Sequence, residues 1–231
     1  MKNKLYKLLV FIFYLLSLFI LLFCIKVRLT SGIYIYTHIR IILLLIACIF
    51  IYLAGLILVK KLNCTKKVLK VNLIIYFIIY TLTIITLTLF DEIFGRQGIV
   101  IAKWNRELLN MYTRNSFNII PFDTIKLFIN GYINGVVTFK DFSINIFGNL
   151  FALMPYGMFI PLMFKKINKY YKFLILMVIL VVTIELLQFI SLSGSCDIDD
   201  LILNVLGASI VYFICKIKFI NKVINKIFLF E

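Results

Sequence analysis

The sequence predicts an all-α, polytopic membrane protein with about six transmembrane helices. Two observations carry this prediction: 63% of the 231 residues are hydrophobic, and the apolar stretches reach bilayer length, about 18 residues or more. These runs are continuous rather than alternating, which favours helices over a β-barrel, because only these two structures satisfy all backbone hydrogen bonds in lipid. We therefore expect residues 1–231 to form a single integral membrane domain with no soluble domain.

Six apolar segments are the predicted membrane spans, and the first three form a group of N-terminal membrane helices within residues 1–90. The predicted spans cover about 5–25, 39–59, 68–90, 142–163, 173–193 and 199–219. The first follows a lysine-rich start, as a signal peptide does. It is longer than a signal h-region and lacks a small-residue cleavage site, so we expect it to remain as a span.

The net charge of +15 comes largely from lysines in short segments between the spans, so no nucleic-acid partner is predicted. If six spans alternate in direction, four lysine-rich segments lie on one side, which the positive-inside rule makes cytoplasmic. These segments are residues 2–7, 60–70, 165–172 and 216–226. Both termini are thus expected inside the cell, and residues 193–199 outside.

The connection between the third and fourth spans, residues 91–141, is external under this topology. Apolar residues at 108–112 beside charged neighbours predict a short helix that lies at the membrane interface. Trp104 suits an anchor at the level of the lipid head groups. Residues 125–137 are apolar but too few to span the bilayer, so they predict a re-entrant or interfacial segment.

Polar side chains inside the last three spans form the candidate site. A carboxylate within a span, such as Glu185, is costly and by default marks a functional site or a polar partner. At about 1.5 Å per helical residue, Asn149 and Glu185 fall at similar depths, and Gln188 is level with Asn204. Gly207 lies near Glu185, where a missing side chain lets helices approach and leaves room for the carboxylate. The alternative for the asparagines is interhelical hydrogen bonding without further function.

Asp197, Asp199 and Asp200 lie in the turn between the fifth and sixth spans. One aspartate suffices to cap the sixth helix. Three aspartates within four residues repel one another unless a cation or a basic group balances their charge. Asp200 shares a helix face with Asn204, so we expect Asp199 to matter less than Asp200. Cation binding is an alternative, but the spacing does not favour it, and the prediction includes no metal and no cofactor.

Nucleophilic catalysis of the usual kind lacks its components. His38 is the only histidine, so neither a histidine-based triad nor an ordinary zinc site can be assembled. Ser193 and Ser195 have no evident base and suit a turn. We therefore predict no catalytic residue.

Four short motifs follow one another in the second half of the chain. They are Asn118-Ile-Ile-Pro-Phe122, Gly148-Asn149-Leu-Phe-Ala-Leu-Met-Pro-Tyr-Gly157, Glu185-Leu-Leu-Gln188 and Asp197-Ile-Asp-Asp-Leu-Ile-Leu-Asn-Val-Leu-Gly207. Together they resemble the VanZ-like family, and the resemblance covers residues 114–215 as a VanZ-like core. It implies a multi-pass protein of the bacterial cytoplasmic membrane, related to an accessory factor of glycopeptide resistance linked to teicoplanin.

The resemblance supplies no reaction, because the mechanism of the family is not settled. Members often carry an arginine just before the acidic run, where this chain has residues 193–196 as Ser-Gly-Ser-Cys. If that arginine pairs with the aspartates elsewhere, Arg114 is the nearest candidate for the same role here. Without such a base, the site is altered or inactive.

The preferred function is non-enzymatic: binding of a cell-envelope ligand at an outward-facing polar site, which modulates antibiotic susceptibility. The expected partner is a membrane lipid, a lipid-linked wall precursor or a glycopeptide antibiotic; no oligomeric state is predicted. The predicted ligand-binding residues are Arg114, Asn118, Asn149, Glu185, Gln188, Asp197, Asp200 and Asn204. One alternative is a membrane enzyme with a carboxylate base. Another is a small transporter, which the apolar inner halves of the spans disfavour.

Overall fold

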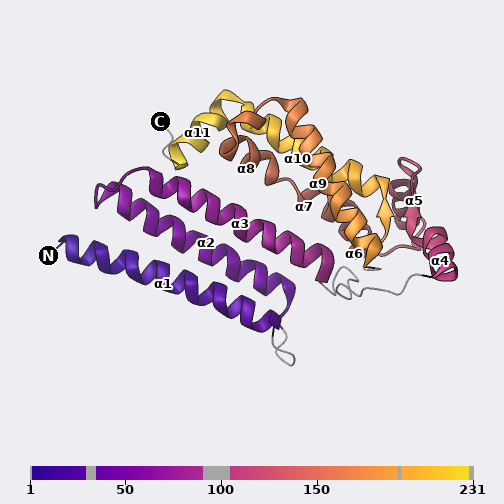
Figure 1. Cartoon of the computed structure of the whole chain (residues 1–231), viewed down its shortest axis with the longest axis horizontal. Helices are drawn as coiled ribbons and strands as arrows, with labels where there is room; N and C mark the ends of the chain where they lie inside the picture. The colour runs from indigo at the N-terminus through magenta and orange to yellow at the C-terminus, as the bar shows by residue number, and fades with distance from the viewer. Residues whose placement is uncertain (1, 30–34, 91–104, 192–193, 229–231) are drawn as a thin grey trace. The chain divides into compact units, whose positions relative to one another are not determined.

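The computed structural model describes residues 2–29, 35–90, 105–191 and 194–228, and within them the regular structure is almost entirely helical (Figure 1). The chain divides into two compact units. Unit 1 comprises Met1–Leu82 with Lys222–Glu231, and unit 2 comprises Thr83–Asn221. The all-α prediction is confirmed. The division into two units does not test whether the whole chain forms a single membrane domain, which stays a prediction.

Among the described residues, six segments are helical, long and apolar enough to cross a membrane. They are α1 (Lys2–Leu29), α2 (Thr37–Lys60), α3 (Lys67–Phe90), the segment Phe139–Met163, α9 (Tyr170–Ile190) and α10 (Ile198–Lys216). Each coincides with a predicted span to within a few residues. The chain is therefore a multi-pass membrane protein, as the sequence predicts.

Close packing in unit 1 depends on small and polar residues of α2 and α3. Ala54 and Gly55 are buried on α2, and the buried Asn72 of α3 donates its side-chain amide to the Ile51 carbonyl at 3.0 Å. A side chain on Gly55 would collide with Asn72 and Leu69. Small residues and interhelical hydrogen bonds are the usual means of helix association in lipid, where burial of apolar surface gives little driving force.

The fourth candidate span is a broken helix. It consists of α6 (Phe139–Ser143), a π-helical turn η2 (Ile144–Gly148), α7 (Asn149–Ala152) and α8 (Tyr156–Met163). The break between α7 and α8 coincides with Pro155, which has no backbone N–H to continue the hydrogen-bond ladder. The π-helical turn rotates the residues that follow it relative to a regular helix, and such turns recur at functional sites. Asn149 is the first residue after it.

Two glycines let α10 pack against α7 and α8 backbone to backbone. A Cβ atom on Gly207 would overlap the Leu150 carbonyl oxygen, and one on Gly157 would overlap that of Ala208 and lie 2.7 Å from the Tyr212 nitrogen. The close helix approach expected at Gly207 is therefore present. The vacated space is filled by the α7 backbone rather than by the Glu185 carboxylate.

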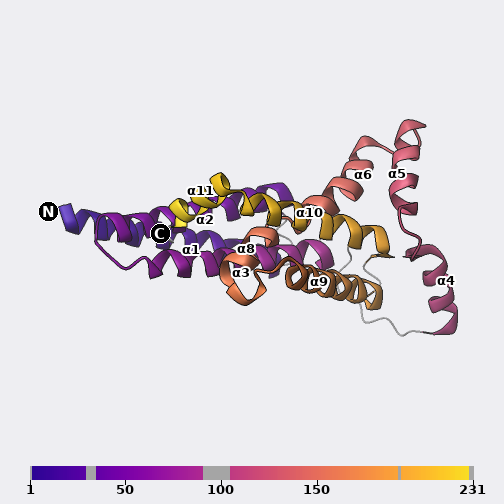
Figure 2. The ribbon, with the colours of Figure 1, turned by 90° about the horizontal axis from the view of Figure 1, so that it is seen from above.

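The connection before the fourth span contains two helices joined by a short strand: α4 (Arg106–Ser116), β1 (Phe117–Asn118) and α5 (Asp123–Ile133). Figure 2 shows α4 and α5 lying across the end of α9 and α10. There β1 pairs in parallel with β2 (Cys196–Asp197), which joins α9 to α10. The predicted helix at 108–112 is part of α4, whereas Trp104 lies outside the described residues. An external, interfacial position for this segment stays a prediction.

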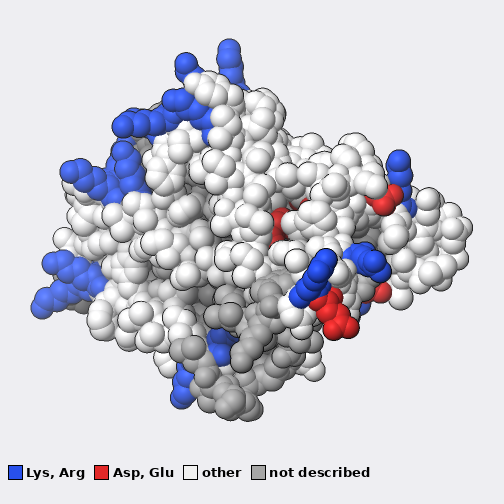
Figure 3. All heavy atoms as spheres, turned by 45° about the vertical axis from the view of Figure 1, so that its right-hand side comes forward, with Lys and Arg blue, Asp and Glu red and all other residues white. Residues whose placement is uncertain are grey.

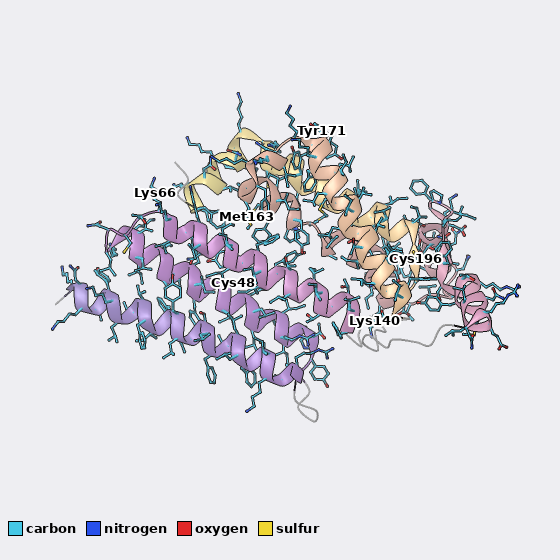
Figure 4. The ribbon with its side chains drawn as sticks, viewed as in Figure 1. Cys48, Lys66, Lys140, Met163, Tyr171 and Cys196 are labelled. Atoms are coloured by element: carbon cyan, nitrogen blue, oxygen red, sulfur yellow. The ribbon has the colours of Figure 1, made fainter. Side chains whose placement is uncertain are left out.

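The two ends of unit 2 differ in charge. In Figure 4, Tyr171 and Cys196 mark opposite ends of α9. The Tyr171 end holds the lysines of residues 165–172, and there the Lys216 ammonium and the Tyr212 hydroxyl both bond to Asn168. Figure 3 shows that the other end, around α4 and α5, carries side chains of both signs. This asymmetry supports the predicted topology, whose assignment of sides stays a prediction.

Candidate functional site

The candidate site is assembled where β1 meets β2. In the parallel pair, Phe117 lies opposite Cys196 and Asn118 lies opposite Asp197. The Asn118 amide donates to an Asp197 carboxylate oxygen at 3.1 Å and to the Thr124 hydroxyl at 2.9 Å. The backbone pairing thus places the first and last of the four sequence motifs in direct contact.

Asp197 combines two roles at the start of α10. Its Oδ1 atom accepts from the Asp199 backbone N–H at 2.8 Å, which is the N-cap interaction expected for one aspartate of the run. The same oxygen accepts the Asn118 amide. The helix cap is therefore also a bond between distant segments, and the capping and site interpretations of Asp197 are not exclusive.

Glu185 faces the same turn from within α9. It is only 7% exposed, and its Oε2 atom accepts the Asp197 backbone N–H at 3.2 Å. A buried carboxylate in an apolar span requires such a donor. Glu185 thus lies beside Asp197, and it supports the backbone of the acidic turn.

Asp199 makes the most enclosed contact of the acidic run. It is 0% exposed, and its two carboxylate oxygens accept the backbone N–H groups of Phe122 at 2.5 Å and Ile125 at 3.0 Å. These amides belong to the first turn of α5, where Phe122, at φ 68°, offers no side-chain cap. A carboxylate at a helix N-terminus satisfies free amides and complements the helix dipole. Asp199 therefore caps a helix 74 residues away in sequence.

Asp200 belongs to a third group of contacts, with the fourth span. The Asn149 amide donates to Asp200 Oδ1 and, at 3.1 Å, to the Asn145 carbonyl. The Asn204 amide donates to the Asp200 carbonyl at 2.8 Å and to Asn149 Oδ1 at 3.4 Å. Asp200 and Asn149 are both half-buried. Asn149 and Asn204 thus meet at Asp200, whereas their estimated depths had placed Asn149 level with Glu185 and Asn204 level with Gln188.

Gln188 and Arg114 lie apart from these contacts. Gln188 is buried and donates to the Thr88 carbonyl of α3 at 2.8 Å instead of joining Asn204. Arg114 is exposed in the last turn of α4. Within the part of the chain that the structure describes, it forms no hydrogen bond or ion pair with the aspartates. Its suggested pairing with the acidic run stays a prediction.

The three aspartates diverge to three different elements. Asp197 bonds to β1, Asp199 to α5 and Asp200 to α7. Amide donors of the protein itself therefore offset part of the mutual repulsion of the three carboxylates. Over the described ranges, no group of three or more His, Cys, Asp or Glu side chains is arranged to hold a metal ion.

Aromatic side chains close the site on the α4 side. The Tyr112 hydroxyl donates to the Gly194 carbonyl, and its ring meets that of Phe189 edge to face at 5.3 Å. Phe117 contacts Phe189 in the same manner at 6.1 Å. Such edge-to-face pairs stabilise by about 0.5–1.5 kcal/mol beyond area burial. They fix α4 and β1 against the end of α9.

Cys196 lies between these groups and responds to their charge. Burial raises the pKa of its thiol, and the negative charges of Glu185, Asp197 and Asp200 raise it further. The thiol is half-buried and is not in a disulfide. It is therefore a weak nucleophile at neutral pH. Its pKa depends on the charges of the neighbouring carboxylates, so its reactivity can be used to detect changes in them.

Sequence reasoning missed the role of Asp199 and of Thr124, and it underrated the 118–122 turn as a structural element. One signal was available: the helix that begins at Asp123 follows a proline and a phenylalanine, neither of which can cap it. A helix start without a local cap calls for an acceptor elsewhere. Asp199 provides it.

The fold and these contacts define a multi-pass helical membrane protein with a polar cluster at one end of its last two spans. A family model described as VanZ/LLP1 matches residues 77–220, a stretch that includes every predicted site residue. The match covers more than half of the chain, and the protein belongs to the VanZ/LLP1 family. No curated protein and no solved structure matches it significantly.

Proposed function

We propose that the protein binds the head group of a lipid-linked cell-envelope ligand at the polar cluster and thereby modulates susceptibility to glycopeptide antibiotics. The observation that carries this proposal is the half-buried pair of Asp200 and Asn149 beside the buried Asp197, Asp199 and Glu185. The buried groups hold the backbone, while the pair keeps polar surface for a ligand. A binding site requires ligand-contacting side chains that are held in place by a rigid layer of buried residues behind them.

Apolar side chains of the 118–122 turn, which contacts Asp199, support an amphipathic ligand. Ile119, Ile120 and Phe122 belong to the turn that Asn118 and Asp199 hold in place, and they are 69%, 63% and 51% exposed. Exposed apolar groups beside a polar cluster indicate a lipid or a ligand with an apolar part. The hydrocarbon portion of a lipid-linked precursor would lie against this turn.

The chemistry of the cluster favours a head group rich in hydrogen-bond donors. Carboxylates accept hydrogen bonds, so Asp200, supported by the buried Asp197, suits hydroxyl, amide or ammonium groups of a sugar–peptide head group. The Asn118 and Asn149 amides add selectivity for such groups. A phosphate would require a base, and Arg114 at the end of α4 is the residue we assign to it. Glu185 and Asn204 act by positioning the others, and Gln188 joins α9 to α3.

Susceptibility would change because the bound precursor or the antibiotic is withheld from its usual partner. Glycopeptides carry amide, hydroxyl and ammonium donors, so they suit the same carboxylates. The proposed site faces outward under the predicted topology, on the side where such antibiotics and the finished precursor occur. Teicoplanin is the antibiotic to test first, since the resemblance to VanZ-like proteins implies it.

Mass spectrometry of lipid retained through purification in mild detergent tests the proposal. We expect the parent chain to retain a lipid with a sugar or peptide head group, and Asp200→Asn to lose most of it. Asp141→Asn is the matched control, because Asp141 is exposed in α6 and its carboxylate bonds to the nearby Thr138 hydroxyl. Retention of the same lipid by all three proteins would remove Asp200 from the site.

A further inference from the structure

We propose that α11 (Lys218–Phe228) is an in-plane membrane helix whose exposed side binds the anionic head groups of the leaflet in which α10 ends. This goes beyond the proposed function, because the polar cluster lies at the start of α10 and α11 follows its other end. The partner is a lipid surface with phosphate-based negative charge. Four observations carry the inference.

The charged residues of α11 form one stripe. Lys218, Lys222 and Lys226 recur at every fourth position and are all exposed. At about 3.6 residues per turn, this spacing keeps them on one side of the helix. α11 contains no acidic residue, so no side chain within the helix neutralises the stripe.

An apolar stripe runs beside the lysines. Phe219, Val223 and Ile227 are also spaced by four, and they are 72%, 38% and 40% exposed. Each follows a lysine by one position, so the two stripes are neighbours on the same side. Lysine stems and apolar groups that point outward together are typical of a helix at the head-group level, where ammonium groups reach phosphates and apolar groups reach acyl chains.

The opposite side of α11 is already in contact with protein. Ile224, on the side away from the lysines, is buried, and the Tyr52 hydroxyl of α2 donates to the Ile227 carbonyl in the last turn of the helix at 3.4 Å. Among the described residues, the buried position of α11 therefore lies away from the lysine and apolar side chains, which are exposed. The side with these two stripes is the one we assign to lipid.

The junction with α10 fixes where α11 begins. α10 ends at Lys216, Ile217 is extended at φ −62° and ψ 126°, and Asn221 already donates to the Ile217 carbonyl at 2.8 Å. A helix that starts within two residues of a membrane span must start at the membrane surface. The Lys216 bond to Asn168 also places this junction beside the lysine-rich 165–172 segment. Positive charge from two segments thus gathers at one surface.

Hydrogen exchange of the full chain in lipid nanodiscs tests the inference. Discs of phosphatidylcholine alone are compared with discs that also contain phosphatidylglycerol. We expect the α11 amides of the parent chain to exchange at least about fivefold more slowly in the anionic discs, the contribution of a single lysine near such a surface. A variant with Lys218→Gln, Lys222→Gln and Lys226→Gln should show no difference between the discs.

Two controls keep the result interpretable. A variant with Asn221→Gln and Asn225→Gln alters the polar side without its charge, and it should respond to lipid as the parent does. The α10 amides report whether each variant remains folded. Equal α11 exchange in both discs for the parent, or a lipid response that survives loss of the three lysines, would overturn the inference. Protection in detergent that grows with protein concentration would assign the exposed side to a second copy instead, and would also overturn it.

Discussion

The Asn118 side-chain amide donates to the Asp197 carboxylate at 3.1 Å, although 79 residues separate the two in sequence. Asp197 also caps α10, and Asn118 orders its own turn by accepting the Ile120 N–H at 2.9 Å. This bond joins the connection before the fourth span to the start of the sixth, together with the β1–β2 pairing and the Asp199 contacts. All three hold the 118–122 turn in position.

A double-mutant cycle measures this bond. Asn118→Ala and Asp197→Ala should each lower the free energy of unfolding, and the double variant should lose less than the sum of the two. Hydrogen bonds to a charged acceptor contribute about 1.5–3 kcal/mol, so we expect a coupling free energy of about 1–2 kcal/mol. Unfolding in mixed detergent micelles gives the values. Additive losses would show that the bond contributes little.

Asp199→Asn should destabilise the protein by about 2 kcal/mol, because the variant keeps one acceptor oxygen and turns an NH₂ group towards a backbone N–H. The site is 0% exposed, so water cannot replace the lost acceptor. Asp123→Asn, an exposed change in the first turn of α5, should stay within about 0.5 kcal/mol of the parent. Thermal unfolding in detergent distinguishes them. Equal effects at both positions would contradict the capping role of Asp199.

Gly207→Ala should force α7 away from α10, because the new methyl group would overlap the Leu150 carbonyl oxygen. Overpacking of this kind costs about 1–3 kcal/mol. Leu206→Ala removes a half-exposed neighbour on the same helix and serves as the control. If Gly207→Ala melts with the parent, the two helices are not in backbone contact.

The Cys196 thiol should react with maleimide slowly at neutral pH and faster as the pH rises beyond the usual thiol range. The sign follows from the raised pKa, because the thiolate is the reactive form and burial and three carboxylates disfavour it. Glu185→Gln removes one of these charges, so it should lower the pKa and speed the reaction at pH 8. An unchanged pH profile in that variant would place Glu185 too far away to act on the thiol.

The same reaction on intact cells reports the topology. With an impermeant maleimide at high pH, Cys196 should be labelled in a single-cysteine variant. Cys64, which is exposed in the lysine-rich α2–α3 connection, should be labelled only after the cells are opened. The reverse labelling pattern would show that the topology is the opposite of the predicted one and that the proposed site faces the cytoplasm.

The sequence predicted the spans well because bilayer length and continuous apolarity are properties of single segments. From helical rise alone it placed Asn149 level with Glu185 and Asn204 level with Gln188, and it did not predict that Asn149 and Asn204 meet. It could not predict that Gln188 turns to the Thr88 carbonyl, or that Asp199 serves Phe122 and Ile125. Their partners are backbone groups of distant segments. Every residue has such groups, so the order of side chains in the sequence does not indicate which ones will be bound.

The central claim, that Asp200 and its neighbours bind a lipid-linked head group, is tested most directly by ligand-induced stabilisation. A short-chain lipid-linked wall precursor is added to the purified protein in detergent, and the midpoint of thermal unfolding is measured. At a concentration of about one hundred times Kd, binding stabilises the native state by about 2.7 kcal/mol. We predict a clear rise in midpoint for the parent and for Asp141→Asn, and none for Asp200→Asn. The same rise in all three proteins, or no rise in the parent, would contradict the account.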